Sequence, residues 1–213
     1  MQRVRILLAD DHALVCSAFQ KLLEPQYEVV GRVGDGRALL KAAEDLRPDV
    51  VLLDITMPLL NGLDAGRELK KRMPHVKLIY LTMNTASDLA EEALRSGASA
   101  YVLKNSQSSE LLQAIDGAMK GKSFISPQVR RAIHDTFVRN PQAVTRPRHL
   151  TERQVEVLQM LAEGRSLKEI ADILQITYRT VRFHKFGLME ELGITSNLEL
   201  VRYAMKQGMI SSV

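Results

Sequence analysis

The first 120 residues alternate five short apolar segments with amphipathic helical patterns, and this alternation restricts the possible folds more than any other feature of the chain. Strands that are apolar nearly throughout are typical of a parallel sheet that helices cover on both faces. The repeat therefore predicts an α/β, doubly wound domain built on a five-stranded parallel sheet. The expected strands are 4–9, 28–33, 49–54, 76–82 and 100–104, and the expected helices lie near 13–23, 36–46, 62–72, 87–96 and 107–120.

Polar side chains stand where four of these apolar strands end. Asp10 and Asp11 follow the first strand, Asp54 ends the third, Thr82 ends the fourth, and Lys104 ends the fifth. In doubly wound sheets, ligands bind outside the carboxyl ends of the strands. Any one of these residues on its own could simply form a turn. Five of them at one edge of the sheet indicate a site.

The chemistry of this edge favours phosphoryl transfer. Several carboxylates close together repel one another unless a cation joins them, and hard oxygen ligands suit Mg²⁺. A lysine and a hydroxyl group can hold phosphoryl oxygens, so a carboxylate here could be converted to an acyl phosphate. Asp54 is the best candidate nucleophile, because it lies on the central strand and is followed by a loop that contains Pro58 and Gly62.

The basic excess of the chain lies in its middle. Residues 121–150 carry six Lys or Arg against one Asp, while the whole chain has a net charge of +4. This segment also contains three prolines, and it reads as a short helix near 127–138 within a basic linker. The chain has a single cysteine and no apolar run of the roughly 18 residues that span a membrane, so we expect a cytoplasmic protein without disulfides.

The last 63 residues predict a small all-α domain of four helices. Capping-box patterns begin at Thr151, Ser166 and Ser196, and Thr177 can cap a further helix. The expected helices lie near 152–163, 167–174, 178–191 and 197–207. The second and third are separated by three residues, which is typical of a helix-turn-helix.

Both halves of the chain resemble known families. ADDH at 9–12, LLDITMP at 52–58, NG at 61–62, LT at 81–82 and YVLK at 101–104 resemble the flavodoxin-like receiver domain of two-component response regulators. Residues from LTERQVEVLQMLAEG to ELVRYAMKQGMI resemble the LuxR-type DNA-binding domain of the NarL/FixJ regulators. The resemblance implies a receiver domain at 1–122, a basic linker at 123–147 and a helix-turn-helix domain at 148–213.

For the receiver, the resemblance implies that Asp54 accepts a phosphoryl group from a sensor histidine kinase. Asp10, Asp11, Asp54 and the backbone carbonyl of Thr56 would hold Mg²⁺. Thr82 and Lys104 would contact the phosphoryl group, and Tyr101 would reorient together with Thr82. Two positions depart from the family pattern: Leu59 stands where glycine is frequent, and Asn105 stands where many receivers have a cis-proline, so we expect a trans bond there.

For the C-terminal domain, the resemblance implies double-stranded promoter DNA as a partner, a homodimer formed on phosphorylation, and RNA polymerase as a further candidate partner. It makes 178–191 the recognition helix and 197–207 a dimer helix, with Leu198, Val201 and Arg202 as candidate dimer contacts. A helical wheel places Val181, His184, Leu188 and Leu192 inward. The candidate DNA contacts are Arg179, Arg182, Phe183, Lys185 and Phe186. The two phenylalanines predict thymine-containing half-sites.

Two other functions are alternatives to that of a transcription regulator. A phosphatase of the haloacid-dehalogenase type would carry a second Asp two residues after its nucleophile, where this chain has Thr56. An autoinducer-binding LuxR regulator would need no acidic cluster, and 5% aromatic residues with no Trp provide little material for an aromatic pocket. We therefore expect a phosphorylation-controlled transcription factor and not an enzyme.

Overall fold

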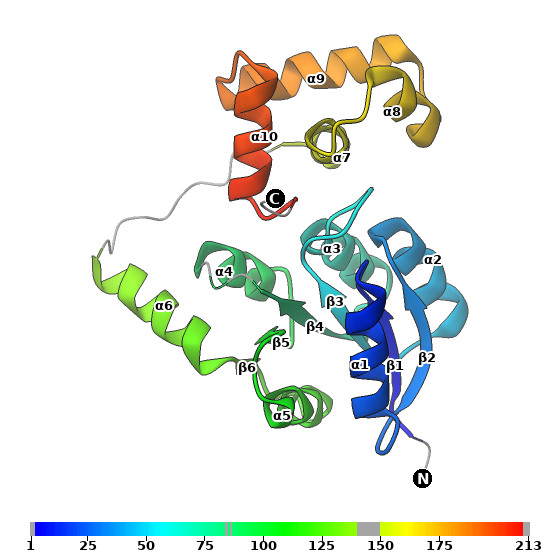
Figure 1. The fold of residues 1–213 in the computed structure, drawn as a ribbon, viewed down its shortest axis with the longest axis vertical. Coiled ribbons are helices and arrows are strands. Elements are labelled where there is room, and N and C mark those ends of the chain that lie inside the picture. Colours follow the sequence, from blue (N-terminus) through cyan, green and yellow to red (C-terminus); the bar gives the residue numbers. More distant parts are fainter. Residues whose placement is uncertain (1–2, 84, 86, 140–149, 211–213) are drawn as a thin grey trace.

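The N-terminal sheet has six parallel strands, one more than the sequence predicts. The computed structural model describes residues 3–83, 85, 87–139 and 150–210. The strand order is β2-β1-β3-β4-β5-β6, so the chain reverses its direction of winding at β1 (Figure 1). The strands are β1 (Arg5–Ala9), β2 (Glu28–Val33), β3 (Val50–Asp54), β4 (Lys77–Thr82), β5 (Ala100–Leu103) and β6 (Phe124–Ile125).

The additional strand β6 corrects the prediction of five strands. It pairs in parallel with β5, with Phe124 opposite Ala100 and Ile125 opposite Tyr101. A strand at the edge of a sheet leaves a row of backbone groups unpaired, and this short segment covers part of that row. Two residues are too few to show the alternating pattern from which strands are predicted, so no pattern in the sequence indicates β6.

Helices cover both faces of the sheet, as the apolar strands predict. On one face, α1 (Ala13–Leu23) and α5 (Ser108–Met119) pack on strand residues such as Ile6 and Leu52. On the other, α2 (Gly36–Leu46), α3 (Gly62–Arg72) and α4 (Ser87–Arg95) pack on residues such as Leu7 and Val51. Alternate residues of each buried strand therefore enter opposite layers of the core.

The first part of the predicted linker is structured against the receiver. After β6, the chain forms α6 (Pro127–Arg139), in which the buried Val129 and the partly buried Ile133 pack into the same core layer as α4. The rest of the predicted linker, 140–147, lies outside the described residues.

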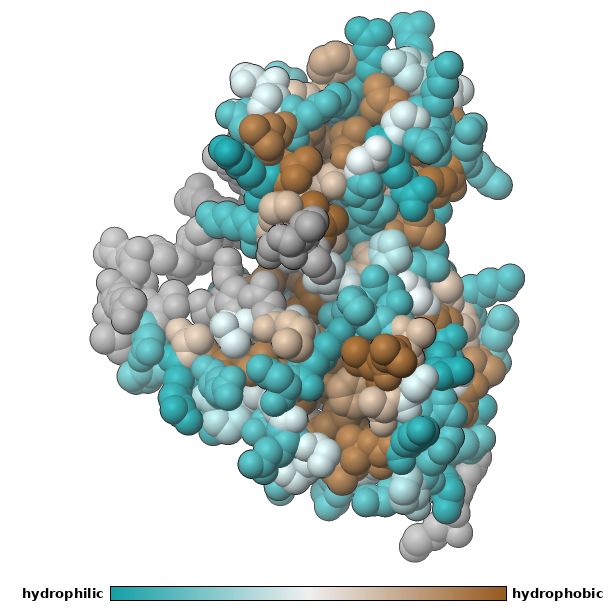
Figure 2. Space-filling model, in the orientation of Figure 1, coloured by the Kyte–Doolittle hydropathy of each residue, from teal (hydrophilic) through white to brown (hydrophobic). Residues whose placement is uncertain are grey.

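The C-terminal domain has four helices: α7 (Glu152–Ala162), α8 (Leu167–Leu174), α9 (Tyr178–Leu192) and α10 (Asn197–Lys206). Capping boxes form at Thr151, Ser166 and Ser196, as predicted. The domain has its own core, which includes Leu158, Ile170, Val181, Leu188 and Leu200. Hydrophilic and hydrophobic residues are mixed over the visible face of both domains (Figure 2). Within the described residues, none of the helices has the length and apolar character to cross a membrane.

Candidate functional site

The polar residues predicted at the sheet edge come from neighbouring strands. Asp10 follows β1, Asp54 and Thr82 are the last residues of β3 and β4, and Lys104 follows β5. Because these strands are parallel and in register, with Asp54 opposite Leu81 and Thr82 opposite Leu103, their carboxyl ends meet at one edge. The fold thus brings together four side chains that are up to 94 positions apart in the sequence.

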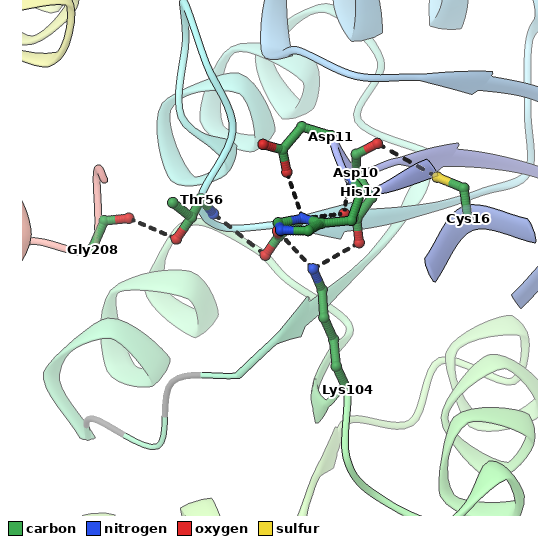
Figure 3. Close-up of polar contacts among 8 residues, drawn as sticks. Asp10, Asp11, His12, Cys16, Thr56, Lys104 and Gly208 are labelled. Carbon is green, nitrogen blue, oxygen red and sulfur yellow. Dashed lines mark hydrogen bonds and ion pairs between the residues drawn. The ribbon is translucent and has the colours of Figure 1, made fainter. Parts of the chain in front are cut away.

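A lysine joins the two buried carboxylates at this edge. The Nζ atom of Lys104 lies 2.7 Å from Asp10 Oδ2 and 2.7 Å from Asp54 Oδ2 (Figure 3). The Asp10 and Asp54 residues are 7% and 4% exposed, so the site holds two buried carboxylates against one ammonium group. This leaves a net negative charge in a poorly solvated place, which favours the binding of a cation.

The environment shifts the pKa of both Asp54 and Lys104 upward. Burial raises the pKa of the Asp54 carboxyl, and the nearby Lys104 ammonium offsets only part of this effect. Burial alone would lower the pKa of Lys104, but ion pairs and hydrogen bonds to Asp54 and Asp10 raise it overall. Lys104 is therefore charged at neutral pH, and its ammonium group lies beside the Asp54 carboxylate oxygen.

The acidic residues and His12 form a group that could bind a metal ion. One ligand atom each from Asp10, Asp11, His12 and Asp54 lies within 4.8 Å of the others. The buried Asp10 Oδ2 has the Lys104 ion pair but accepts no well-aligned hydrogen bond from the described residues. Carboxylate oxygens of this kind suit Mg²⁺, which takes one or two carboxylates and completes its shell with water and phosphate oxygens. The residues present therefore fit the predicted ion.

His12 belongs to the ADDH segment, but the sequence did not predict a role for it. Its Nδ1 atom lies 2.8 Å from Asp11 Oδ1 and 3.2 Å from Asp10 Oδ1, and its backbone N–H donates to Asp10 Oδ1 at 2.9 Å. The ring thus fixes the two acidic side chains relative to each other. Its position directly after the aspartate pair was the only available signal.

The three other residues predicted for this site lie on β4, on β5 and in the loop after β3. Thr82 is 2% exposed and Tyr101 is fully buried, so both side chains lie within the receiver core. Thr56 is half-buried, and its backbone N–H donates to Asp54 Oδ1 at 3.4 Å. The Cys16 thiol donates to the Asp10 carbonyl oxygen at 3.4 Å and is buried, and burial raises its pKa, which disfavours the reactive thiolate. All peptide bonds in the described residues are trans, including the one before Asn105.

The loop from Ile55 to Asn61 follows the nucleophile candidate and has an unusual backbone. Leu59 has a φ of 66°, in the left-handed region that favours glycine. Gly62 closes the loop with an N–H to Ile55 O bond of 2.7 Å, and a Cβ added there would lie 1.9 Å from Asp54 O. Only glycine permits this close approach of α3 to the end of β3.

The C-terminal domain contacts the same loop, which no pattern in the sequence predicts. The buried side chain of Gln159 on α7 donates to Met57 O at 2.5 Å and accepts from Asn61 N at 2.6 Å. Glu163 accepts from the backbone N–H of Leu59 at 3.1 Å. Four consecutive α7 residues, 157–160, are buried, so more than one face of this helix is covered. The spacing of residues in the sequence does not indicate what covers the second face.

The end of α10 makes a second contact beside the site. The Thr56 hydroxyl donates to the carbonyl oxygen of Gly208 at 3.2 Å (Figure 3). Gly208 has a φ of 66°, and a Cβ added to it would lie 2.8 Å from Leu89 Cδ1 of α4. A glycine is therefore needed where the chain leaves α10 and meets the receiver. An ion pair of 2.8 Å between Arg37 and Glu156 lies at the same domain boundary.

The predicted DNA-reading face of α9 is open to solvent. Phe183 and Phe186 are 73% and 56% exposed, so most of each side chain is open to solvent. Arg179 and Arg182 are exposed and Lys185 is half-buried. Val181, Leu188 and Leu192 face the core as the wheel predicts, and His184 is half-buried beside them. α9 lies on the side of its domain away from the sheet (Figure 1).

The three candidate dimer contacts lie on the outer part of α10. Leu198 is 60% exposed, Arg202 is exposed, and Val201 is half-buried. Leu200 and Ala204 instead fill the core of the domain.

Comparisons with known proteins agree with this architecture. Residues 6–116 match the family of response regulator receiver domains, and residues 148–204 match the bacterial regulatory proteins of the luxR family. The oxygen regulatory protein NreC of Staphylococcus aureus is 34% identical over 215 residues, covering 97% of this chain and 99% of its own. These are transcription regulators and not enzyme families.

Solved structures of response regulators have a similar fold. The RcsB response regulator of Salmonella typhimurium is 26% identical, with a TM-score of 0.66 over 97% of this chain and 99% of its own. An RcsB–DNA complex is 27% identical, with a TM-score of 0.61 over 97% of this chain and 99% of that one. The chain therefore belongs to the NarL family of response regulators, in which a receiver domain precedes a LuxR-type helix-turn-helix domain.

Proposed function

We propose that this response regulator accepts a phosphoryl group on Asp54 from a sensor histidine kinase, and that the phosphorylated form dimerises and binds promoter DNA in the cytoplasm. The observation that carries the proposal is Asp54 itself, a buried carboxylate at the end of the central strand that lies 2.7 Å from the Lys104 ammonium group and beside Asp10. A solved complex of RcsB with DNA and a structure of RcsB dimers on DNA support the second half. RNA polymerase is a further candidate partner at the promoter.

The proposed reaction forms one bond and breaks one. An Asp54 carboxylate oxygen attacks the phosphorus of a phosphohistidine on the kinase, the phosphorus–nitrogen bond breaks, and the electron pair stays on the imidazole, which takes a proton from water. Asp10, Asp11, Asp54 and the Thr56 carbonyl would hold Mg²⁺, which neutralises charge on the phosphoryl oxygens when bound. The role of Lys104 and Thr82 is to donate hydrogen bonds to those oxygens.

The contacts of the helical domain suggest how the site acts on DNA binding. Thr56 donates to Gly208 and the next residue, Met57, accepts from Gln159, so the loop that follows Asp54 holds both α7 and the end of α10. Phosphorylation would displace this loop and weaken both contacts. Two released helical domains can then occupy adjacent half-sites, and the second binding event becomes intramolecular. Leu198, Val201 and Arg202 are the proposed dimer contacts.

Phosphoryl labelling of the full chain tests the proposal. With acetyl phosphate and Mg²⁺, we expect one acid-stable, alkali-labile phosphoryl group per chain, and sedimentation should show more dimer after labelling. Asp54→Asn should abolish both effects, while Asp45→Asn, at an exposed carboxylate on α2, should leave both unchanged. Full labelling of the Asp54→Asn protein would contradict the assignment of the site. Labelling without any change in mass or DNA affinity would contradict the switch.

A further inference from the structure

The recognition helix carries two exposed aromatic rings that neither the protein core nor the receiver uses. Phe183 and Phe186 are among the few large apolar side chains that are more than half exposed in the described residues. They lie three positions apart on α9, so they are neighbours on one face of the helix. Single exposed apolar residues are common on proteins, but two adjacent phenylalanines on a DNA-facing helix create an apolar surface that water hydrates poorly.

Positive charge lies on one side of these rings, and the exposed Glu190 lies one turn after Phe186 on the other side. The guanidinium carbon of Arg182 lies 5.3 Å from the centre of the Phe186 ring, a cation–π contact that places the charge beside the ring. Arg179 lies one turn earlier and is also exposed. Burial, and secondly the charge of Arg153, lowers the pKa of the neighbouring His184, so that ring is neutral at physiological pH and adds no charge. The surface is thus apolar at its centre and cationic on the side of Arg179 and Arg182, which fits a nucleic acid better than a second apolar protein surface.

We propose that Phe183 and Phe186 are specificity-determining residues that read thymine C5-methyl groups in the major groove. This inference rests on the proposed function, because it assumes that α9 enters DNA. Only thymine presents a methyl group at the floor of the major groove, and apolar side chains recognise it by contact. Uracil offers the same hydrogen-bonding edge without the methyl group. A comparison of binding to thymine and to uracil therefore distinguishes contact with the methyl group from polar contacts with the base.

The spacing of the rings specifies how many base pairs are read. Residues three apart on a helix are separated by about 4.5 Å along its axis. Successive base pairs are about 3.4 Å apart. The two rings therefore reach adjacent base pairs, and each half-site should contain two neighbouring thymines, on the same strand or on opposite strands. Arg182, held against the Phe186 ring, is a positioning residue that keeps this ring in the groove and leaves its own N–H groups for a phosphate or base.

Thymine-to-uracil substitution on selected duplexes tests the inference. Duplexes are enriched from a random pool with the full-length, phosphorylated protein, and the best one is then synthesised with uracil at each thymine in turn. For the wild-type protein we expect two adjacent positions per half-site at which loss of the methyl group weakens binding about fourfold, the effect of removing one buried methyl-sized group. This arm leaves the protein unaltered, so it is independent of protein stability.

Protein variants assign each position to a ring. Phe183→Ala should become indifferent to the methyl group at one of the two positions, and Phe186→Ala at the other. Arg179→Ala is the matched control: it should weaken binding equally on thymine and uracil duplexes, because its polar contacts do not involve the methyl group. Phe183→Met keeps an apolar side chain and should retain most of the discrimination.

Three results would overturn the inference. Equal binding of the wild-type protein to thymine and uracil duplexes would show that no methyl group is read. An unchanged thymine-to-uracil ratio in both alanine variants would show that other residues read it. Failure of the wild-type protein to enrich any duplex would refute the proposed function and this inference with it, whereas the first two results leave the proposed function standing.

Discussion

At the scale of single residues, Leu59 adopts a backbone conformation that is unfavourable for its residue type. Its φ of 66° lies in the region where an L-residue has a steric cost of about 1–3 kcal/mol, yet its backbone N–H donates to Glu163. The family's frequent glycine at this position is explained by this conformation. The structure therefore shows the backbone conformation that makes glycine frequent at this position. The sequence alone shows only that Leu59 departs from the family pattern.

Two substitutions at this position should have opposite effects on the strain of the backbone. Leu59→Val puts a β-branched side chain in the left-handed region and should lower the free energy of unfolding by more than about 1 kcal/mol. Leu59→Gly removes the strain but also some apolar burial, so its effect should be well below that of valine. Chemical denaturation of the full chain, monitored by a signal from the receiver domain, measures the free energy of unfolding of both variants. A glycine variant as unstable as the valine variant would show that the side chain, and not the backbone, holds the loop.

At the scale of helices and strands, local signals decided which elements the sequence could predict. The helices that begin with a capping box were predicted to within one or two residues. The side-chain oxygens of Thr151, Ser166 and Ser196 each accept a local hydrogen bond from the backbone N–H of the third helical residue. The residues at the ends of the strands were found because an apolar run stops there. The short β6 and the buried Gln159 had no such signal, since both depend on what a distant segment offers.

The capping box of α10 makes a pH dependence predictable. Backbone hydrogen bonds from Thr195 and Ser196 lower the pKa of Glu199 below its usual 4.5. A carboxyl whose pKa is lower in the folded state stabilises the fold above its unfolded pKa, and this contribution is lost as the pH falls through the folded value. We therefore expect the start of α10 to open more readily below about pH 4.5, and Glu199→Gln to weaken this pH dependence.

Amide hydrogen exchange of α10 in the full chain measures the effect. Ser196→Ala removes the other half of the box and should lower the local opening free energy by about 1 kcal/mol at neutral pH. Ser108→Ala, at the start of α5, where Gln107 makes no side-chain cap, is the control and should leave α10 unchanged. Equal protection of α10 in the wild-type and Ser196→Ala proteins would show that tertiary packing alone fixes this helix end.

At the scale of the whole molecule, the two domains meet at the loop after Asp54 and leave the DNA-reading face uncovered. α7 and the end of α10 lie against the receiver, and α9 lies on the far side (Figure 1). The closed arrangement therefore does not block a single copy of α9 from DNA. What it fixes is the orientation of the helical domain relative to its receiver, and thus the ability of two copies to align on two half-sites.

Gln159 is the residue through which this arrangement can be tested, because its buried amide group bonds Met57 O and Asn61 N at the same time. Gln159→Ala leaves these buried groups without partners, which costs the closed form about 1–3 kcal/mol. Since 1.4 kcal/mol corresponds to about a tenfold change in an equilibrium constant, the unphosphorylated variant should bind a duplex with two half-sites roughly tenfold more tightly than the wild-type protein does. Binding to a duplex with one half-site should change less than about twofold, because α9 is already exposed.

Fluorescence anisotropy with the two duplexes, together with the radius of gyration from small-angle scattering, measures the effect of opening. Gln113→Ala removes an exposed glutamine on α5, away from the boundary, and should match the wild-type protein in both assays. An equal gain on both duplexes would mean that closure hides α9 itself. A larger radius of gyration without tighter binding to the two-site duplex would mean that the contact of Gln159 with Met57 and Asn61 does not limit the binding of two copies. Phosphorylation would then have to control DNA binding through another surface.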